Sequence, residues 1–573
     1  MRPQYAPFPI RMKKPYHLLL ALLLGAARPA AAQAPAVATL HAVQTIALGP
    51  NATLGGTIRL PNHNTVLLLT DTERPTLQAQ CLSPEGRTLW ETTVARFQHP
   101  RMEGVFGNTI SATDKMADDQ VRYATTTTPV SVFTLGNSVV VVERISPSAI
   151  KKLPKDTPFE AGQVYVQHLS EQGRLTRSAF APLPQPKGDA PSPRLVGRYV
   201  DAKGFVEIMR EDTYPKKNVR EQAFYLLHYD FGATEIRREP LALPPSPWLT
   251  GSWDMFRLWY QDWAYLGHRP NQTYFCRRTL VNADAPKEKA GAQPLVYQVC
   301  IVDDAGHAVP GGFSTTLGLQ KGTIPVYSGA IPNYGELDYA VQRFVSTSNV
   351  TSAVSYDSWA TTAVGSFYLD HATGDVLLYG EYGEGDLPSY ELRPELLGFF
   401  EQRYSADGKP LARLQLPYSK ELTAHKKAGS FTGQYGRRIG FHLDPLTGQS
   451  QYSFAPMHVM GTGEDFDLFL DPQLHLQRVE FVPGAQKNDN VYTTVYYAMP
   501  FNLFKASGSS TETRRYAHAH PTDPPVYAAL EQRSRAAGPQ PFHEFHLSVT
   551  GPGTGLVVER NLGTGGTLQV FTF

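Results

Sequence analysis

Two short segments of this 573-residue sequence place carboxylates or imidazoles close enough together to suggest chemistry. In the first, Asp465 and Asp467 alternate within 464–467 (EDFD), so an extended strand would present both carboxylates on one face. Such a pair could bind a cation or act as an acid and a base. Paired carboxylates also occur where a strand meets solvent, and calcium loops supply more oxygen ligands. Both interpretations stay open.

The second segment contains His518 and His520, followed by Asp523. Two imidazoles at this spacing can bind one metal ion, whereas the nearby prolines are typical of a loop. The segment 543–546 (HEFH) is one residue too short for the HExxH motif of a zinc protease. The sequence contains no Gly-x-Ser-x-Gly elbow and no phosphate-binding P-loop. It therefore predicts no catalytic residue and no cofactor, and it leaves the two carboxylates and two imidazoles as candidate metal ligands.

Cysteine chemistry depends on one pair. Cys276 and Cys300 flank the polar segment 282–294 and are equidistant from Glu288, so a hairpin centred there would place the sulfurs opposite each other. Opposed strand positions satisfy the Cα separation of a disulfide, and an oxidising compartment would permit the bond. The alternative is two buried thiols in separate strands. Cys81 is expected to be buried and inert, and without a CxxC motif neither redox catalysis nor a zinc–thiolate site is indicated.

Four of the six tryptophans lie within 247–268. On an extended strand Trp253, Trp259 and Trp263 would share one side, and apolar residues would also occupy the other side. A strand that is apolar on both faces predicts burial between two sheets. The alternative is an aromatic platform that binds sugar rings or a partner chain.

Short runs rich in β-branched and aromatic residues, separated by Gly, Pro, Asn and Asp, recur to the end of the chain and predict an all-β fold. The clearest are 64–70 (NTVLLLT), 138–142 (SVVVV), 163–169 (QVYVQHL), 222–229 (QAFYLLHY) and 294–302 (PLVYQVCIV). Only 526–536 (VYAALEQRSRA) predicts a helix.

Many of these runs end in one local pattern: an apolar residue, then Ser or Asp, a short polar turn and Gly. Ser or Asp can hydrogen-bond the turn backbone, and Gly supplies the positive φ of a tight hairpin. Recurrence over nearly 400 residues indicates one repeated supersecondary unit. Six copies are complete: 82–86 (LSPEG), 169–173 (LSEQG), 302–306 (VDDAG), 369–374 (LDHATG), 404–408 (YSADG) and 443–448 (LDPLTG).

With these hairpins the chain resembles β-propeller repeat proteins of the quinoprotein-like or Kelch-like type. The segments 81–90 (CLSPEGRTLW) and 403–416 (RYSADGKPLARLQL) are similar to the outer hairpins of propeller blades. The resemblance is to an architecture and indicates no specific functional family. The sialidase Asp-box is not matched, because Glu85 and Gly86 depart from its pattern. We expect a single propeller of six to eight four-stranded antiparallel blades, with seven favoured because about 540 residues allow about 77 per blade.

Closure of such a ring requires its ends to join. We therefore expect the strand-like stretch 37–48 to pair with the C-terminal stretches 555–559 or 567–573. The aromatic C-terminal strand also suggests an alternative fold, an outer-membrane β-barrel. Strands such as 139–145 lack the sustained alternation that a barrel needs.

The N-terminus has the order of a secretory signal: Lys13 and Lys14, an apolar run at 18–24, and Ala30 to Ala32. We predict a signal peptide over residues 1–32, with translation starting at Met12, and a propeller domain over 33–573. Export to the periplasm or the cell exterior follows. Lys and Arg number 53 against 52 Asp and Glu, and 42% of residues are hydrophobic, so we expect neither nucleic-acid binding nor a membrane span in the mature chain.

Three functions remain open. The first is an exported, non-catalytic propeller that binds a protein or polysaccharide through loops at one mouth of its ring. The second is a glycan-acting hydrolase or lyase with carboxylates or histidines gathered around the central channel. The third is the outer-membrane barrel.

Overall fold

The computed structural model describes most strands of the chain and their turns. The described residues are 36–49, 52–71, 76–95, 131–145, 160, 163–181, 193–201, 204–216, 219–231, 236–244, 263–280, 295–319, 323–326, 367–384, 396–419, 422, 438–455, 465–482, 493–498, 513–516, 518–538, 543–561 and 566–573. The predicted signal peptide lies outside them. Within them no helix is long and apolar enough to cross a membrane.

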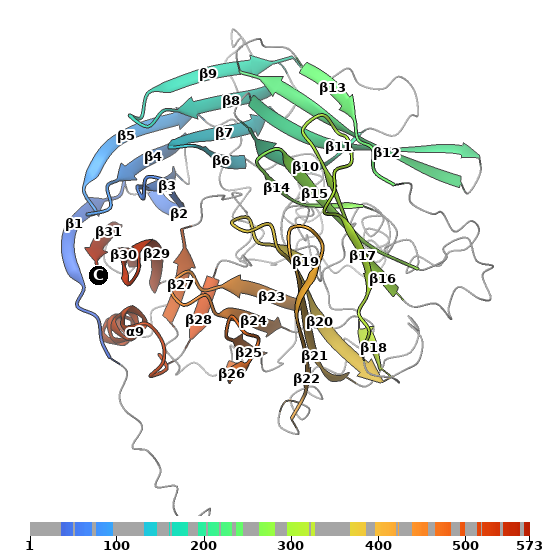
Figure 1. The fold of residues 1–573 in the computed structure, drawn as a ribbon. Coiled ribbons are helices and arrows are strands. Elements are labelled where there is room, and N and C mark those ends of the chain that lie inside the picture. The colour runs from blue at the N-terminus through green and yellow to red at the C-terminus, as the bar shows by residue number, and fades with distance from the viewer. Residues whose placement is uncertain are drawn as a thin grey trace, which may run out of the picture.

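Seven separate sheets surround a common centre, so the chain is an all-β, seven-bladed propeller (Figure 1). The sequence prediction is confirmed, and the strands do not form the single closed sheet of the barrel alternative.

Blades 1 to 4 are four-stranded, antiparallel and consecutive in sequence. Blade 1 contains β2 (Ala52–Arg59), β3 (Thr65–Asp71), β4 (Thr76–Leu82) and β5 (Thr88–Ala95). Blade 2 contains β6 (Ser131–Leu135), β7 (Ser138–Arg144), β8 (Val164–Leu169) and β9 (Leu175–Phe180). Blade 3 contains β10 (Arg194–Val200), β11 (Gly204–Lys216), β12 (Val219–Asp230) and β13 (Ile236–Pro240). Blade 4 contains β14 (Ala264–Arg269), β15 (Gln272–Leu280), β16 (Leu295–Val302) and β17 (Phe313–Thr316).

Blade 5 has an interrupted first strand. Both β18 (Thr323–Val326) and β19 (Phe367–Leu369) pair with β20 (Val376–Glu384), at opposite ends of it, so together they fill the place of one strand. β21 (Leu396–Tyr404) and β22 (Pro410–Pro417) complete the blade. Blade 6 contains β23 (Arg438–Leu443), β24 (Ser450–Ala455), β25 (Asp465–Leu470) and β26 (Leu476–Val482).

Blade 7 joins the two ends of the chain. β1 (His41–Ala47) pairs antiparallel with β31 (Thr567–Thr572), which continues through β30 (Thr554–Asn561) to β29 (His543–Gly551). The predicted closure of the ring by an N-terminal strand is thus confirmed. Two further strands, β27 (Thr493–Tyr497) and β28 (Thr513–Tyr516), extend this sheet beyond β29, with β27 parallel to it. The predicted helix follows as α9 (Pro525–Ala537).

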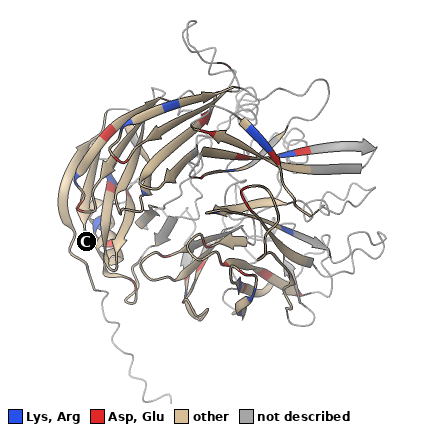
Figure 2. Ribbon diagram, turned by 45° about the horizontal axis from the view of Figure 1, so that its top comes forward, with Lys and Arg blue, Asp and Glu red and all other residues tan. Residues whose placement is uncertain are grey.

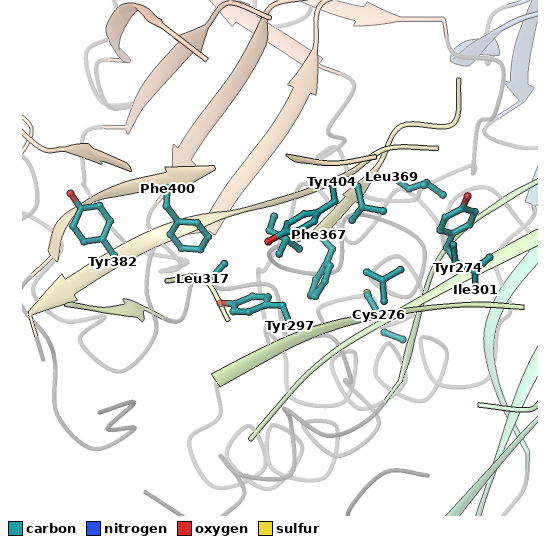
Figure 3. Packing of buried hydrophobic residues seen from close by; sticks show 14 residues of the cluster. Tyr274, Cys276, Tyr297, Ile301, Leu317, Phe367, Leu369, Tyr382, Phe400 and Tyr404 are labelled. Atoms are coloured by element: carbon teal, nitrogen blue, oxygen red, sulfur yellow. The ribbon is translucent and has the colours of Figure 1, made fainter. Parts of the chain in front are cut away.

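Seven hydrophobic clusters are described: six each join two neighbouring blades, and the seventh lies between the sheet of blade 7 and α9, with Leu446 of blade 6 packed against it. Figure 3 shows the cluster between blades 4 and 5, where the ring of Tyr297 in blade 4 lies against the ring of Phe367 in blade 5. Because each blade is covered on both faces, its central strands are apolar on both faces, as in β7 (SVVVVER). This burial explains why the sequence shows continuous apolar runs as well as alternation.

The repeated turns lie at one end of the strands. Four complete copies join the third and fourth strands of a blade, and two, Asp370–Gly374 and Asp444–Gly448, join the first and second. Antiparallel order puts both kinds of turn on the same face of the ring, which we call the turn face. The final Gly of every complete copy has a positive φ, between 69° and 85°. The reason that the sequence analysis gave for glycine at this position is therefore confirmed.

Hydrogen bonds to three of the repeated turns join neighbouring blades. Gln44 of β1 donates from Nε2 to the carbonyl of Gly86 at 2.6 Å, and the hydroxyl of Thr92 donates to the carbonyl of Gly173 at 2.7 Å. The backbone N–H of Ala242 donates to the carbonyl of Gly306 at 2.8 Å. The repeated turn is therefore a connector between blades as well as a reversal of the chain.

Candidate functional site

The face opposite the turn face carries the long connections between strands, and we call it the connection face. Strands that meet a short turn at one end must join the next strand at the other. The connections of nine or more residues that begin there are 96–130, 145–163, 181–193, 241–263, 281–294, 385–395, 418–437, 456–464 and 483–492. Most of their residues lie outside the described part of the chain. Charged residues of both signs are dispersed over the blades themselves (Figure 2).

One of the three candidate tryptophans is described. Trp263 is 2% exposed, lies in the cluster between blades 3 and 4, and donates from Nε1 to the carbonyl of Pro244 at 2.8 Å. The guanidinium of Arg277 lies 4.2 Å from the centre of its ring. Trp263 is therefore a core residue, as the sheet-packing interpretation expects. Trp253 and Trp259 lie outside the described residues.

The predicted Cys276–Cys300 disulfide is not formed. Cys276 pairs with Val299, and Cys300 pairs with Phe275, so the hairpin is shifted by one residue from the symmetric register. A one-residue shift moves a side chain to the other face of a sheet. Cys276 accordingly packs between blades 4 and 5, whereas Cys300 packs between blades 3 and 4. The alternative of two buried thiols applies, and Cys81 is also buried, as expected.

The two candidate metal sites lie in different parts of the molecule. Asp467 of β25 is 4% exposed and accepts a hydrogen bond from Nε2 of Gln451 at 2.8 Å. Asp465 begins the same strand, in blade 6. His518 and His520 precede α9. No group of three or more His, Cys, Asp or Glu side chains that could hold a metal ion occurs among the described residues.

The two histidines near α9 have separate neighbours. His518 is exposed and contacts Glu531 of α9, with 3.1 Å between Nδ1 and Oε1. Nδ1 of His520 lies 2.8 Å from the hydroxyl of Thr522. Asp523, by contrast, is buried and binds Arg478 of β26 through both of its oxygens, at 2.7 and 3.3 Å. Asp523 therefore attaches the α9 segment to blade 6, the two histidines contact neighbours within that segment, and the three side chains do not converge on a ligand.

The HEFH segment forms the start of β29. His546 is buried there, and burial lowers its pKa to about 3, with the positive charge of Arg560 adding to the effect. Its imidazole is therefore neutral over the physiological pH range.

One polar cluster was not anticipated from the sequence. At the turn-face end of the junction between blades 3 and 4, the rings of Tyr199 and His268 stack at 3.6 Å, and Nε2 of His268 lies 3.3 Å from Oδ1 of Asp304. Beside them, Nε2 of His228 lies 3.4 Å from Oε2 of Glu239. Tyr199 is 3% exposed, and burial raises its pKa far above the usual value. Burial also lowers the pKa of His228, against the opposing effect of Glu239.

These residues occupy four strands and one turn, separated by tens of positions, so no local motif connects them. The sequence gives one indication only: His228 lies near the end of β12, and Asp304 lies in the turn that follows β16. Their arrangement offers hydrogen-bond donors and acceptors at a partly solvent-accessible place. It does not contain an activated nucleophile.

Comparisons with known proteins identify no family for this chain. No protein-family model matches the chain. No curated protein matches it either. Similar solved structures include a protein of unknown function from Dyadobacter fermentans, with 11% identity over 77% of this chain and 98% of that one and a TM-score of 0.24. A polysaccharide lyase, Uly1, has 8% identity, covers 93% and 99% of the two chains, and has a TM-score of 0.32. A GH43_1 enzyme from Xanthomonas citri has 9% identity, covers 57% and 81%, and has a TM-score of 0.23. At these values the similarities carry no information about activity.

Proposed function

We propose that this chain is an exported, non-catalytic binding protein that takes a protein or polysaccharide ligand on its connection face. The proposal rests on a structural difference between the two faces of the ring. Turn carbonyls and turn glycines on one face are used to fasten blades together. The other face receives nearly all the long connections, and binding residues in repeat scaffolds concentrate on such segments.

The first strand of blade 5 adds to this argument. In sequence, residues 327–366 separate β18 from β19, which together occupy the position of a single strand. An insertion at this point does not disturb the pairing of β20 with β21. The blade scaffold thus tolerates long additions, which is the property that a binding fold requires.

The enzymatic alternative required candidate acids or imidazoles to gather in one place. Asp467 and His520 are held by different neighbours in different parts of the fold. Nothing in their described geometry favours hydrolysis or elimination, so the binding function is the better supported one.

Affinity electrophoresis of residues 33–573 through gels that contain neutral or acidic polysaccharides tests the proposal. The matched variants are Trp259→Ala, in the long connection 241–263, and Trp263→Ala, in the core. We expect Trp259→Ala to unfold at the wild-type temperature and to lose retardation. Trp263→Ala should unfold at a lower temperature, because removal of a buried aromatic costs about 3–5 kcal/mol.

Two results would count against this assignment. Retention that persists when the connections 96–130 and 241–263 are both replaced by Gly-Ser linkers would place the ligand elsewhere. Release of shortened or unsaturated sugars during incubation would make the protein an enzyme. If every polysaccharide fails, surface plasmon resonance against exported proteins of the same cell tests the protein-ligand form, with the same variants as controls.

A further inference from the structure

Blade 6 has one apolar face and one polar face. Its strands alternate in character, so aromatic and aliphatic residues such as Tyr452 pack against blade 5. The opposite face, towards blade 7, carries buried polar residues. Gln451 and Asp467 are 3% and 4% exposed there and are hydrogen-bonded to each other at 2.8 Å. Arg478 shares this face, with its guanidinium 3.9 Å from the centre of the ring of Phe469.

Helix α9 fills the junction between blades 6 and 7 and is attached firmly to blade 7. Apolar residues of the helix, among them Val526 and Leu530, pack on the blade 7 sheet. Among the described residues, blade 6 contributes only Leu446 to this cluster. Arg533 of the helix also donates to Glu559 of β30 at 2.7 Å. The helix and blade 7 therefore form one unit.

The contacts of the α9 segment with blade 6 are mostly polar. Arg478 donates to both oxygens of Asp523, at 2.7 and 3.3 Å, and the two side chains are 8% and 2% exposed. The hydroxyl of Tyr527 donates to Asp444, in a turn of blade 6, at 2.9 Å. At each of the other six junctions, by contrast, one apolar cluster contains residues of both blades.

We propose that the ring opens at the junction between blades 6 and 7, with the Arg478–Asp523 ion pair as its latch. Separation of two apolar faces costs free energy in proportion to the area exposed, whereas separated polar groups form hydrogen bonds to water instead. Polar interfaces within one chain accordingly permit relative motion. Blade 7 and α9 would move together, away from the polar face of blade 6. This inference goes beyond the proposed ligand and does not depend on it.

Adjacent residues of β24 supply a matched pair of reporters. Gln451→Cys places a thiol on the face towards blade 7. Ser450→Cys places one on the face towards blade 5, where Arg403 donates to Ser450 at 3.2 Å. Ser450 and Gln451 are 0% and 3% exposed, so labelling of either thiol requires a junction to open.

Maleimide labelling of folded 33–573 at neutral pH, followed by peptide mass spectrometry, measures the rate at each thiol. We expect position 451 to react about tenfold faster than position 450, because local opening differs between junctions. Asp523→Asn should raise the rate at position 451 by about a further tenfold, because it weakens a charge-assisted hydrogen bond. The variant should fold, since Glu480 remains 2.7 Å from Arg478.

The native thiols are internal controls, because they lie in three apolar junctions. Their rates should be the same in the Asp523→Asn variant as in the wild type; they are Cys81 between blades 1 and 2, Cys300 between blades 3 and 4, and Cys276 between blades 4 and 5. Faster labelling of all of them would show global unfolding in place of local opening and would count against the proposal.

Two other results would overturn it. One is equal labelling at positions 450 and 451, and the other is a rate at position 451 that does not respond to Asp523→Asn. If Gln451→Cys does not fold, Asp467→Cys supplies a second reporter on the polar face, with Leu468→Cys as its counterpart towards blade 5.

Discussion

Burial controls the chemistry of the cysteines. The pKa of the Cys81 thiol is raised to about 12, mainly by burial and then by the negative charge of Glu171. Burial also raises the pKa of Cys300, against the effect of Arg277. Since the thiolate is the reactive form, both side chains are protected at neutral pH.

We therefore expect no reaction of the folded protein with Ellman's reagent at pH 8 on the timescale of minutes. After unfolding in guanidinium without a reductant, three thiols should react, because Cys276 and Cys300 face different blade junctions. A count of one thiol would show that the two are joined after all.

His546 makes the stability of blade 7 dependent on pH. Its pKa falls from 6.5 to about 3 on folding. Between these two pH values the imidazole binds a proton in the unfolded chain and does not bind one in the folded chain. The stabilisation present above pH 6.5 is lost as the pH falls from there towards 3, at up to about 1.4 kcal/mol per pH unit.

The substitution His546→Gln should reduce the loss of urea stability between pH 7 and pH 4. His518→Gln is the control, because its imidazole is 77% exposed, and it should preserve the wild-type pH dependence. Equal pH profiles for wild type and His546→Gln would contradict the role assigned to burial.

At the scale of single elements, the repeated turn combines two requirements in one glycine. Gly173 has a φ of 74°, and a Cβ added there would lie 2.7 Å from the indole ring of Trp90 in the preceding blade. The indole N–H of Trp90 donates to the carbonyl of Glu171 in the same turn, at 2.7 Å. Glycine is needed here both for the backbone conformation and for contact between blades.

Gly173→Ala should lower the free energy of unfolding by about 2–5 kcal/mol, from left-handed strain and from displacement of the indole. Gly136→Ala separates the two effects, because Gly136 has a φ of 55° with nothing within 4 Å of the added Cβ. The Gly136→Ala substitution should lower the free energy of unfolding by about 1–2 kcal/mol, from backbone strain alone. If urea unfolding shows the same decrease in free energy of unfolding for both variants, the contact between Gly173 and Trp90 contributes nothing to stability.

At the scale of the whole molecule, closure of the ring depends on β1. Without it, the edge of β31 would be exposed, and Ile46 would no longer cover the cluster between blades 1 and 7. Exposed sheet edges promote association between molecules. Deletion of residues 36–47 should therefore abolish cooperative unfolding and produce aggregates in size-exclusion chromatography, whereas removal of 1–32 should not.

A rescue experiment makes this test specific. His41 is paired with Thr572, so the start of β1 and the end of β31 lie together. A chain that starts at residue 49 and carries 36–48 after Phe573, through a short linker, should recover the monomer and its cooperative unfolding. Failure of this permuted chain would mean that the N-terminal segment does more than supply a strand.

Local physics explains what could be predicted from sequence alone. Positive φ at a tight turn favours Gly, and a strand covered on both faces favours a continuous apolar run, so the repeated turns and a propeller of six to eight blades could be inferred without coordinates. The strand at 41–47 and the helix after Pro525 were found by the same local rules.

Tertiary structure decided the features that depend on register and on contacts between distant segments. A shift of one residue in the β15–β16 hairpin separated Cys276 from Cys300, and no local pattern determines that shift. Tyr199, His268 and Asp304 meet because two blades pack side by side. Sequence spacing cannot anticipate such a meeting, since packing of whole blades, and not the order of residues, sets the distances.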